Sequence, residues 1–227
     1  VIKKYGADTQ RLYTLFIGPP QKDAEWNDDA ISGAHRFLRR LWTQVVEFDG
    51  PAEVYSGDGD KLSAPAKALF RKTHQTVRKV TADIEQSWQF NTAVAAVMEL
   101  SNQYAATGLS DDSAPVRMFA LETMVRLLHP FVPHISEELW QHLGHQPSVM
   151  DAGWPAFDED ACREETVEYG VQVNGKLRER FTVSADVPED EIQQTALELP
   201  KVKSAIGDAQ VRKIFVVKGR LVNIVAK

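Results

Sequence analysis

The stretch Pro115–Gly144, PVRMFALETMVRLLHPFVPHISEELWQHLG, decides the fold of most of the chain. Pro130 and Pro133 lack backbone N–H donors and disfavour helical geometry at the residues before them. We therefore expect the helix that precedes them to end near His129. The apolar residues of this helix recur at three- and four-residue steps, which predicts one buried face: Met118, Leu121, Val125 and Leu128.

A second helix is predicted just after the prolines. Ser136 precedes Glu137 and Glu138, and acidic side chains are favoured at the positive N-terminal end of a helix, so we place the start there. A chain that turns between two apolar helices forms a corner against which other helices can pack. The apolar stripe of the second helix is Ile135, Leu139 and Leu143, with Trp140 beside it.

Earlier segments show the helical patterns that complete a bundle. Asp8 or Thr9 is expected to cap a short helix, and a longer one should run from Asn27, its cap, to about Phe48. The longest pattern runs from about Ala64 to Ser87, and another helix opens at Trp88–Thr92. We predict an all-α antiparallel bundle of about four or five amphipathic helices.

The helix expected from Ala64 to Ser87 has two contrasting faces. Phe70, Thr73, Val77, Val80 and Ile84 form an inward seam. A different face carries Lys67, Arg71, His74 and Arg78, and a second row carries Lys72 and Lys79. Two interpretations stay open, a solvated charged face or a phosphate-binding face, because Lys and Arg displace the counterions condensed on nucleic acids. The candidate contacts on this helix are Lys67, Arg71 and Arg78.

The periodicity changes from 3.6 to 2 near residue 167, and Asn174-Gly175 is a hairpin turn signal. A regular two-residue turn would mix apolar and basic side chains on one face. We therefore predict a bulge or a three-residue connection, pairing Val173 with Leu177 and Tyr169 with Phe181. The basic residues left on the open face or in the turn are Lys176, Arg178 and Arg180.

Two short helices and two strands complete this region. Pro188 opens the first helix, Pro200 the second, and Gly207 ends it. Strands are expected at 212–217 and 221–225. The order β-β-α-α-β-β predicts a small α+β domain, an antiparallel sheet with helices on one face. Its further candidate contacts are Arg212, Lys213, Lys218 and Arg220.

Charge is divided unevenly along the 227 residues, whose net charge is −6. From residue 167 onward there are ten Lys and Arg against eight Asp and Glu, and no acid follows Asp208. Such a difference points to a basic binding region. No apolar run approaches the ~20 residues that span a bilayer. The single cysteine, Cys162, fits a reducing compartment. The histidines do not have the spacing of metal ligands.

Several runs resemble class I aminoacyl-tRNA synthetases. LHPFVPH followed by EELW resembles the last helices of their tRNA anticodon-binding domain, shared by the leucyl, isoleucyl and valyl enzymes. KYGADT, RLY and GPP with the following KDAEW resemble bacterial-type leucyl enzymes after their KMSKS loop. VQVNGKLRERF and VRKIFVVKGRLVNIVAK resemble the terminal domain of the same enzymes, so the resemblance covers essentially the whole chain.

The resemblance implies a cytoplasmic, monomeric parent enzyme that joins leucine to its tRNA with ATP and Mg²⁺. HIGH and KMSKS motifs and the editing domain are missing from this sequence. We therefore expect a cut fragment that binds leucine tRNA and the catalytic domain of the same chain, with no catalytic residue, metal or cofactor of its own.

The expected organisation is a connecting segment (1–26), a helical anticodon-binding-type domain (27–147), a linker (148–166) and an α+β tRNA-binding domain (167–227). Two alternatives stay open. The chain is the same region of a valyl or isoleucyl enzyme, or it is a non-enzymatic helical module that binds proteins, which would present a continuous exposed apolar patch.

Overall fold

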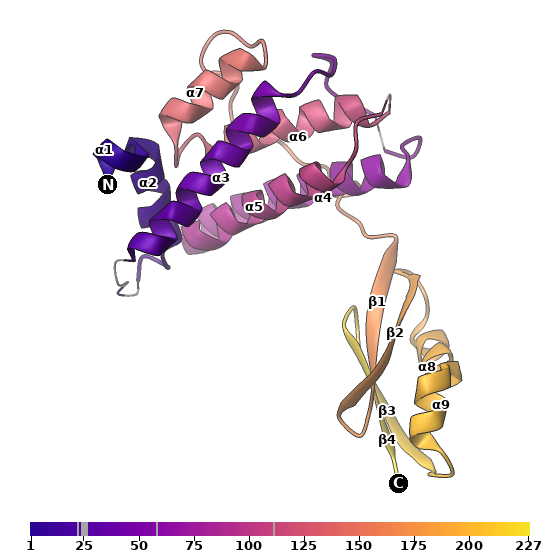
Figure 1. Cartoon of the computed structure of the whole chain (residues 1–227). Helices are drawn as coiled ribbons and strands as arrows, with labels where there is room; N and C mark the ends of the chain where they lie inside the picture. Colours follow the sequence, from indigo (N-terminus) through magenta and orange to yellow (C-terminus); the bar gives the residue numbers. More distant parts are fainter. Residues whose placement is uncertain (22, 24–26, 58, 111) are drawn as a thin grey trace. The chain divides into compact units, whose positions relative to one another are not determined.

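The structure, a computed structural model, describes residues 1–227 except 22, 24–26, 58 and 111. It divides into two units, which we name the helical unit (Val1–Cys162) and the sheet unit (Arg163–Lys227). This confirms the predicted succession of a helical domain and a small domain built on a sheet (Figure 1).

All the regular secondary structure described in the helical unit is helical. α4 packs against both α5 and α6 (Figure 1). The buried side chains of all three helices belong to one apolar core. No helix formed by the described residues is long and apolar enough to cross a membrane. The helices are α1 (Ile2–Tyr5), α2 (Ala7–Phe16), α3 (Asp28–Val46), α4 (Ala64–Ser87), α5 (Phe90–Ala106), α6 (Ser113–Leu128) and α7 (Pro133–His142).

The predicted corner lies between α6 and α7. α6 ends at Leu128 with His129 as its C-cap, as predicted. The predicted start of the second helix at Ser136 was wrong, because α7 begins at Pro133. Proline suits the first helical turn, where its missing N–H would have had no partner in any case. Ser136 lies inside the helix and is buried.

Of the two predicted helix caps, one is confirmed. Asn27 Oδ1 accepts hydrogen bonds from two backbone N–H groups in the first turn of α3, at 2.9 and 3.2 Å. Capping of α2 by Asp8 or Thr9 was wrong, because Gly6 holds the N-cap position. Asp8 Oδ2 instead accepts the N–H of Ile135 at 2.7 Å, so this carboxylate stabilises the start of α7.

The stretch 148–166 was predicted as a linker, but most of it packs on the helices. Arg126 Nη2 donates to the carbonyl of Ala152 at 2.9 Å, and Gln75 Nε2 donates to the carbonyl of Cys162 at 2.9 Å. Because backbone carbonyls are held this way, the helical unit extends through Cys162.

The sheet unit has four strands in the spatial order β2-β1-β4-β3. The two hairpins are antiparallel, but β1 and β4 pair in parallel, so the prediction of an antiparallel sheet was wrong for the central pair. The helical crossover makes a parallel pairing sterically accessible. The elements are β1 (Thr166–Val173), β2 (Lys176–Ser184), α8 (Glu189–Glu198), α9 (Pro200–Ile206), β3 (Val211–Val217) and β4 (Leu221–Ala226).

The first hairpin contains the predicted irregularity. Asn174 and Gly175 both have positive φ and form a two-residue turn, so Lys176 pairs with Val173. The predicted pairing of Val173 with Leu177 was therefore wrong. A bulge one pair further along the strands restores the apolar register. As predicted, the rings of Tyr169 and Phe181 lie opposite one another and stack, with centroids 5.8 Å apart.

Candidate nucleic-acid interface

The cations predicted on α4 share its surface with acids. Lys67 Nζ lies 3.4 Å from Asp60 Oδ1, and Arg78 Nη1 lies 2.9 Å from Glu159 Oε2. Both acids come from segments outside the helix. Arg71 is half-buried. The positive charge of this row is therefore largely offset within the helical unit.

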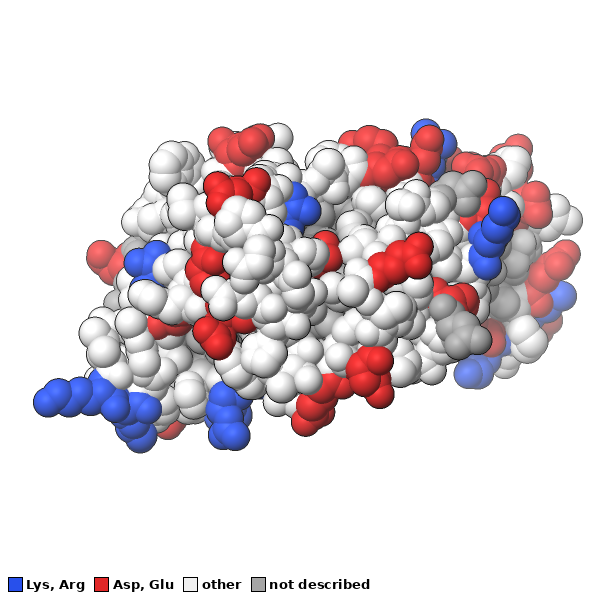
Figure 2. Space-filling model, turned by 90° about the horizontal axis from the view of Figure 1, so that it is seen from above, with Lys and Arg blue, Asp and Glu red and all other residues white. Residues whose placement is uncertain are grey.

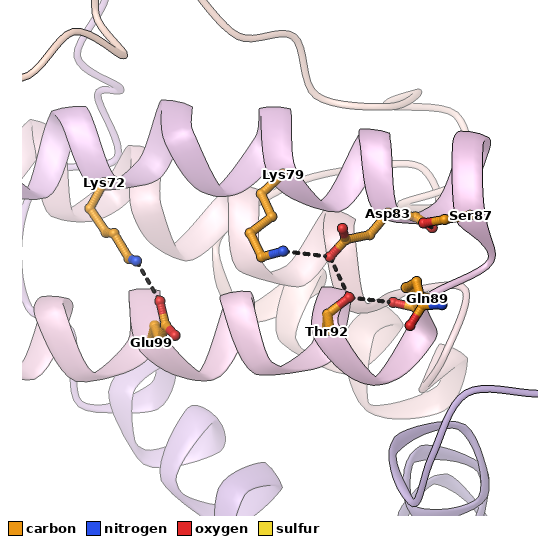
Figure 3. Close-up of polar contacts among 7 residues, drawn as sticks. All are labelled: Lys72, Lys79, Asp83, Ser87, Gln89, Thr92 and Glu99. Carbon is orange, nitrogen blue, oxygen red and sulfur yellow. Dashed lines mark hydrogen bonds and ion pairs between the residues drawn. The ribbon is translucent and has the colours of Figure 1, made fainter. Parts of the chain in front are cut away.

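The second row of α4 is also occupied by ion pairs (Figure 3). Lys72 Nζ lies 2.7 Å from Glu99 Oε2 of α5, and Lys79 Nζ lies 2.9 Å from Asp83 Oδ2. The same Asp83 oxygen accepts the hydroxyl of Thr92 at 2.6 Å. Lys72 therefore joins α4 to α5 directly, whereas Lys79 pairs within α4 and holds Asp83, which accepts from Thr92 of α5.

His74 does not belong to the outer face on which the sequence placed it. Its side chain is buried, and Nδ1 accepts the N–H of Asp158 at 3.1 Å. Burial lowers the pKa of His74, an effect that the nearby Asp158 carboxylate partly opposes. A neutral histidine therefore anchors the 148–162 segment and contributes no positive charge to a nucleic-acid surface.

Figure 2 shows how charged side chains are distributed on the face seen from above. In Figure 2, acidic side chains are spread over most of the visible face, and Lys and Arg side chains gather mainly toward its edges. A polyanion would meet mixed charge there, which weakens its attraction.

The predicted cations of the sheet unit are more exposed and less often paired with acids than those of α4. All seven predicted candidates are exposed: Lys176, Arg178, Arg180, Arg212, Lys213, Lys218 and Arg220. Within this unit, all of whose residues are described, Arg180 is the only one of the seven in an ion pair; its Nη1 lies 2.7 Å from Glu168 Oε1. The remaining six are therefore available to an anionic partner.

The fold separates these cations into groups. Arg180 and Arg220 line one shallow groove, and Lys213 lies on the same face of the sheet by its register. Arg178 lines a different hollow beside the first turn of α9, together with Lys201. The sequence did not select Lys201, since only the fold brings α9 next to β2.

Phe215 is the residue on this face that the sequence analysis missed. It is 45% exposed, and the ammonium of Lys213 lies 4.6 Å from its ring centroid. The strand period could have found it, because its half-buried neighbours Ile214 and Val216 pack against the core cluster and Phe215 must point the other way.

The described residues contain no group of three or more His, Cys, Asp or Glu side chains placed to hold a metal ion. The features with chemical content in the sheet unit are thus cations, an exposed aromatic ring and an open sheet face. Such a surface can bind phosphate and stack against flat rings.

Comparisons with known proteins show which family the chain resembles. Residues 66–193 match the family described as the anticodon-binding domain of tRNA ligase. The chain is 45% identical over 229 residues to the leucine–tRNA ligase of Geobacter sp. (strain M21), and 47% identical over 230 residues to that of Geotalea uraniireducens (strain Rf4). Each alignment covers 99% of this chain, which spans 28% of the length of those relatives.

A solved structure gives the same result. The chain is similar over its full length to the agnB2 LeuRS of Agrobacterium radiobacter K84, in a ternary complex with tRNA and LeuAMS, with a TM-score of 0.80 and 31% identity. It covers 29% of that chain. The chain therefore belongs to the family of anticodon-binding domains of tRNA ligases.

Proposed function

We propose that this chain is the tRNA-docking portion of a leucine–tRNA ligase. The observation that carries the proposal is the concentration of exposed cations without carboxylate partners on the sheet unit. Counterion release from RNA phosphates would supply most of the affinity. The helical unit would support the tRNA body, and the sheet unit would hold the outer corner and the variable arm.

The contacts would read shape more than sequence. The major-groove base edges of A-form RNA, which differ most between base pairs, lie in a deep and narrow groove that side chains do not reach, whereas phosphates and ribose hydroxyls are accessible. Arginine forks match phosphate oxygens with two parallel hydrogen bonds, and lysines act as mobile point charges. Arg220 and Lys218 in the β3–β4 turn would supply such donors at one end of β3, and Arg212 and Lys213 would supply them at the other end.

The chemistry of the parent enzyme would belong to residues outside this chain. The parent would join leucine to its tRNA with ATP and Mg²⁺ and act as a monomer, and this chain by itself would be inactive. Its partners would be leucine tRNA and the catalytic domain of the same polypeptide. Because the chain spans 28% of its curated relatives, catalytic and editing residues have ample room elsewhere.

The alternatives from the sequence have less support. The relatives named above are leucine ligases, which speaks against a valyl or isoleucyl enzyme. A protein-binding module would use a continuous apolar patch. The exposed large apolar side chains of the helical unit instead come from several separate elements: Val1, Ile2, Trp42, Val46, Trp88, Leu109, Met150 and Trp154.

Binding of labelled leucine tRNA across a salt series tests the proposal. We expect log K to fall linearly with log salt, with a slope of roughly −0.7 to −0.9 for each phosphate contacted. A chain ending at Cys162 keeps the whole core of the helical unit. Its binding of tRNA should depend on salt much less steeply than that of the full chain. Salt-independent binding, or equal binding by the shortened chain, would contradict tRNA docking by the sheet unit.

A further inference from the structure

The sheet of the sheet unit has one covered face and one face without helices. α8 and α9 lie along the covered side (Figure 1). Ile192 of α8 and Val202 of α9 join the buried strand residues Val171, Val222 and Ile224 in one cluster. Because side chains alternate along a strand, the neighbours of these buried residues point to the opposite, helix-free face.

That helix-free face is unusually apolar for a surface that meets water. Leu177, Phe215 and Val217 are 52%, 45% and 50% exposed. Their strand partners in the register, Gln172, Asn223 and Leu221, lie on the same face. An antiparallel or mixed sheet normally places polar residues on its solvated side. A group of large exposed apolar side chains therefore indicates a binding surface.

Two of these apolar residues, Leu177 and Val217, line a shallow groove of about 330 Å³, and Phe215 is not part of its lining. Gly170 lies in this groove, and a Cβ added there would meet Leu177 Cδ1 at 3.1 Å, so the leucine side chain leans across the glycine. Leu221 and Val217 also line the groove, with Arg180 and Arg220. The volume is at the lower end of the range for small-molecule sites and suits one planar ring system.

The charge on this face is complementary to RNA. Glu168 is the only carboxylate that the strands direct to the helix-free side of the fully described sheet unit, and Arg180 neutralises it. Glu179 points to the helices instead, where it accepts the N–H of Lys201 at 3.0 Å. Lys213 lies beside the Phe215 ring on a flexible stem, within reach of a phosphate attached to a stacked nucleotide.

We propose that the helix-free face binds unpaired nucleotides of an RNA, with one base stacked on Phe215. An adjacent base or ribose occupies the Gly170 groove, and Lys213 and Arg220 hold the flanking phosphates. The bases must be unpaired, because only unstacked bases offer an aromatic face to a protein. This inference rests on the proposed tRNA docking and adds to phosphate contact a recognition of exposed loop bases.

The test compares Phe215→Ala and Phe215→Thr with the parent chain, using a leucine tRNA transcript and a fully paired RNA duplex. Threonine keeps a strand-compatible side chain, and Phe215 is exposed, so neither change opens a core cavity. Trp88→Ala is the matched control, since Trp88 is an exposed aromatic residue (62%) of the helical unit.

We expect both Phe215 variants to bind the transcript about 5- to 150-fold more weakly, the range for losing one stacked base, with an unchanged salt slope. Phe215→Trp, which keeps an aromatic ring at this position, should bind the transcript as tightly as the parent chain. Lys213→Gln should flatten the salt slope by about one unit. Binding of the duplex, and all binding by Trp88→Ala, should stay within about twofold of the parent chain.

Equal binding of the transcript by the parent and by both Phe215 variants would overturn the stacking inference and leave tRNA docking intact. Failure of the parent chain to bind the transcript would overturn both. If the Phe215 variants change only the sedimentation of the chain and not its RNA affinity, the face joins two copies of the protein and the inference is wrong.

Discussion

The helical unit and the sheet unit both carry rows of cations, but they use them differently. On α4, Lys67, Lys72 and Arg78 meet acids from a loop, from α5 and from the 148–162 segment. On the sheet, Lys213 and Arg220 have no such carboxylate within the fully described sheet unit. A row of positive charge therefore predicts RNA binding only where the fold brings no acid within reach.

Removing charge from the two rows should give the largest difference. The variant Arg212→Gln, Lys213→Gln, Lys218→Gln, Arg220→Gln should bind leucine tRNA about 100-fold more weakly at low salt. Its salt slope should be flatter by about three units, because each of the four lost phosphate contacts contributes roughly 0.7 to 0.9. Fluorescence anisotropy with labelled tRNA at several salt concentrations measures both quantities.

The matched variant is Lys67→Gln, Arg71→Gln, Arg78→Gln on α4. Because ion pairs already offset the charges of Lys67 and Arg78, and Arg71 is half-buried, we expect a loss of less than about threefold and little change in slope. A larger loss from the α4 variant than from the sheet variant would reverse the comparison between the two units.

Asp83 should matter for stability because it serves two partners. Its side chain is 16% exposed and accepts from Lys79 and Thr92. Asp83→Ala should lower the free energy of unfolding by about 1.5–3 kcal/mol, the range for hydrogen bonds to a charged group. Urea unfolding followed by tryptophan fluorescence reports it, since all five tryptophans lie in the helical unit.

Glu99→Ala is the control for this measurement. Glu99 is 63% exposed and pairs with Lys72 alone in Figure 3, so its loss should cost less than about 1 kcal/mol. If both variants lowered the free energy of unfolding equally, the two hydrogen bonds of Asp83 would stabilise the fold no more than one exposed ion pair.

The two units should also differ in their response to mild acid, since every histidine lies in the helical unit. Burial lowers the pKa of His74 and of His129, against the opposing influence of nearby carboxylates. Both are favoured neutral in the folded state. Their contribution is complete above the unfolded pKa of 6.5 and is lost as pH falls below it.

We therefore expect the unfolding free energy of the helical unit to decline between pH 7.5 and 5, by no more than about 1.4 kcal/mol per pH unit for each histidine. His74→Gln should reduce this decline. The carboxylate of Asp112, whose pKa is lowered from 3.8 to about 2 by hydrogen bonds from Ser63 and Ser110, stabilises the folded state throughout this range and loses that contribution only as the pH falls below 3.8. If the unfolding free energy of His74→Gln declined with pH as much as that of the parent chain, His74 would not be a source of the decline.

The smallest effect should come from freeing one cation of α4. Glu159→Gln removes the partner of Arg78 at an exposed site, so stability should change by less than about 1 kcal/mol. If RNA passes near α4, the freed guanidinium should raise tRNA affinity about two- to threefold. An unchanged affinity would place α4 outside the RNA path.

Much of the fold follows from local sequence. The bounds of α4, the Asn27 cap and the end of α6 were confirmed because periodicity, capping and proline act within a few residues. The start of α7 was missed because Pro133 outweighs the acids that follow Ser136. The parallel pairing of β1 with β4 joins residues about fifty positions apart, which no local pattern encodes.

The candidate site was less predictable than the fold. Periodicity indicates which face of α4 carries charge, but the neutralising acids Asp60, Glu99 and Glu159 arrive through tertiary packing. For the same reason His74 was placed on the wrong side of its helix. On the sheet, alternation within β3 carried enough information to place Phe215 outside.

The central position of β4 in the sheet affects how the sheet unit folds while the chain is being synthesised. During synthesis β1 and β2 leave the ribosome first and can form a hairpin, but β1 has no second neighbour until β4 follows. The nascent hairpin would expose its apolar side and one unpaired edge throughout that interval. Translation pauses late in this region should therefore raise the chance of aggregation more than pauses within the helices.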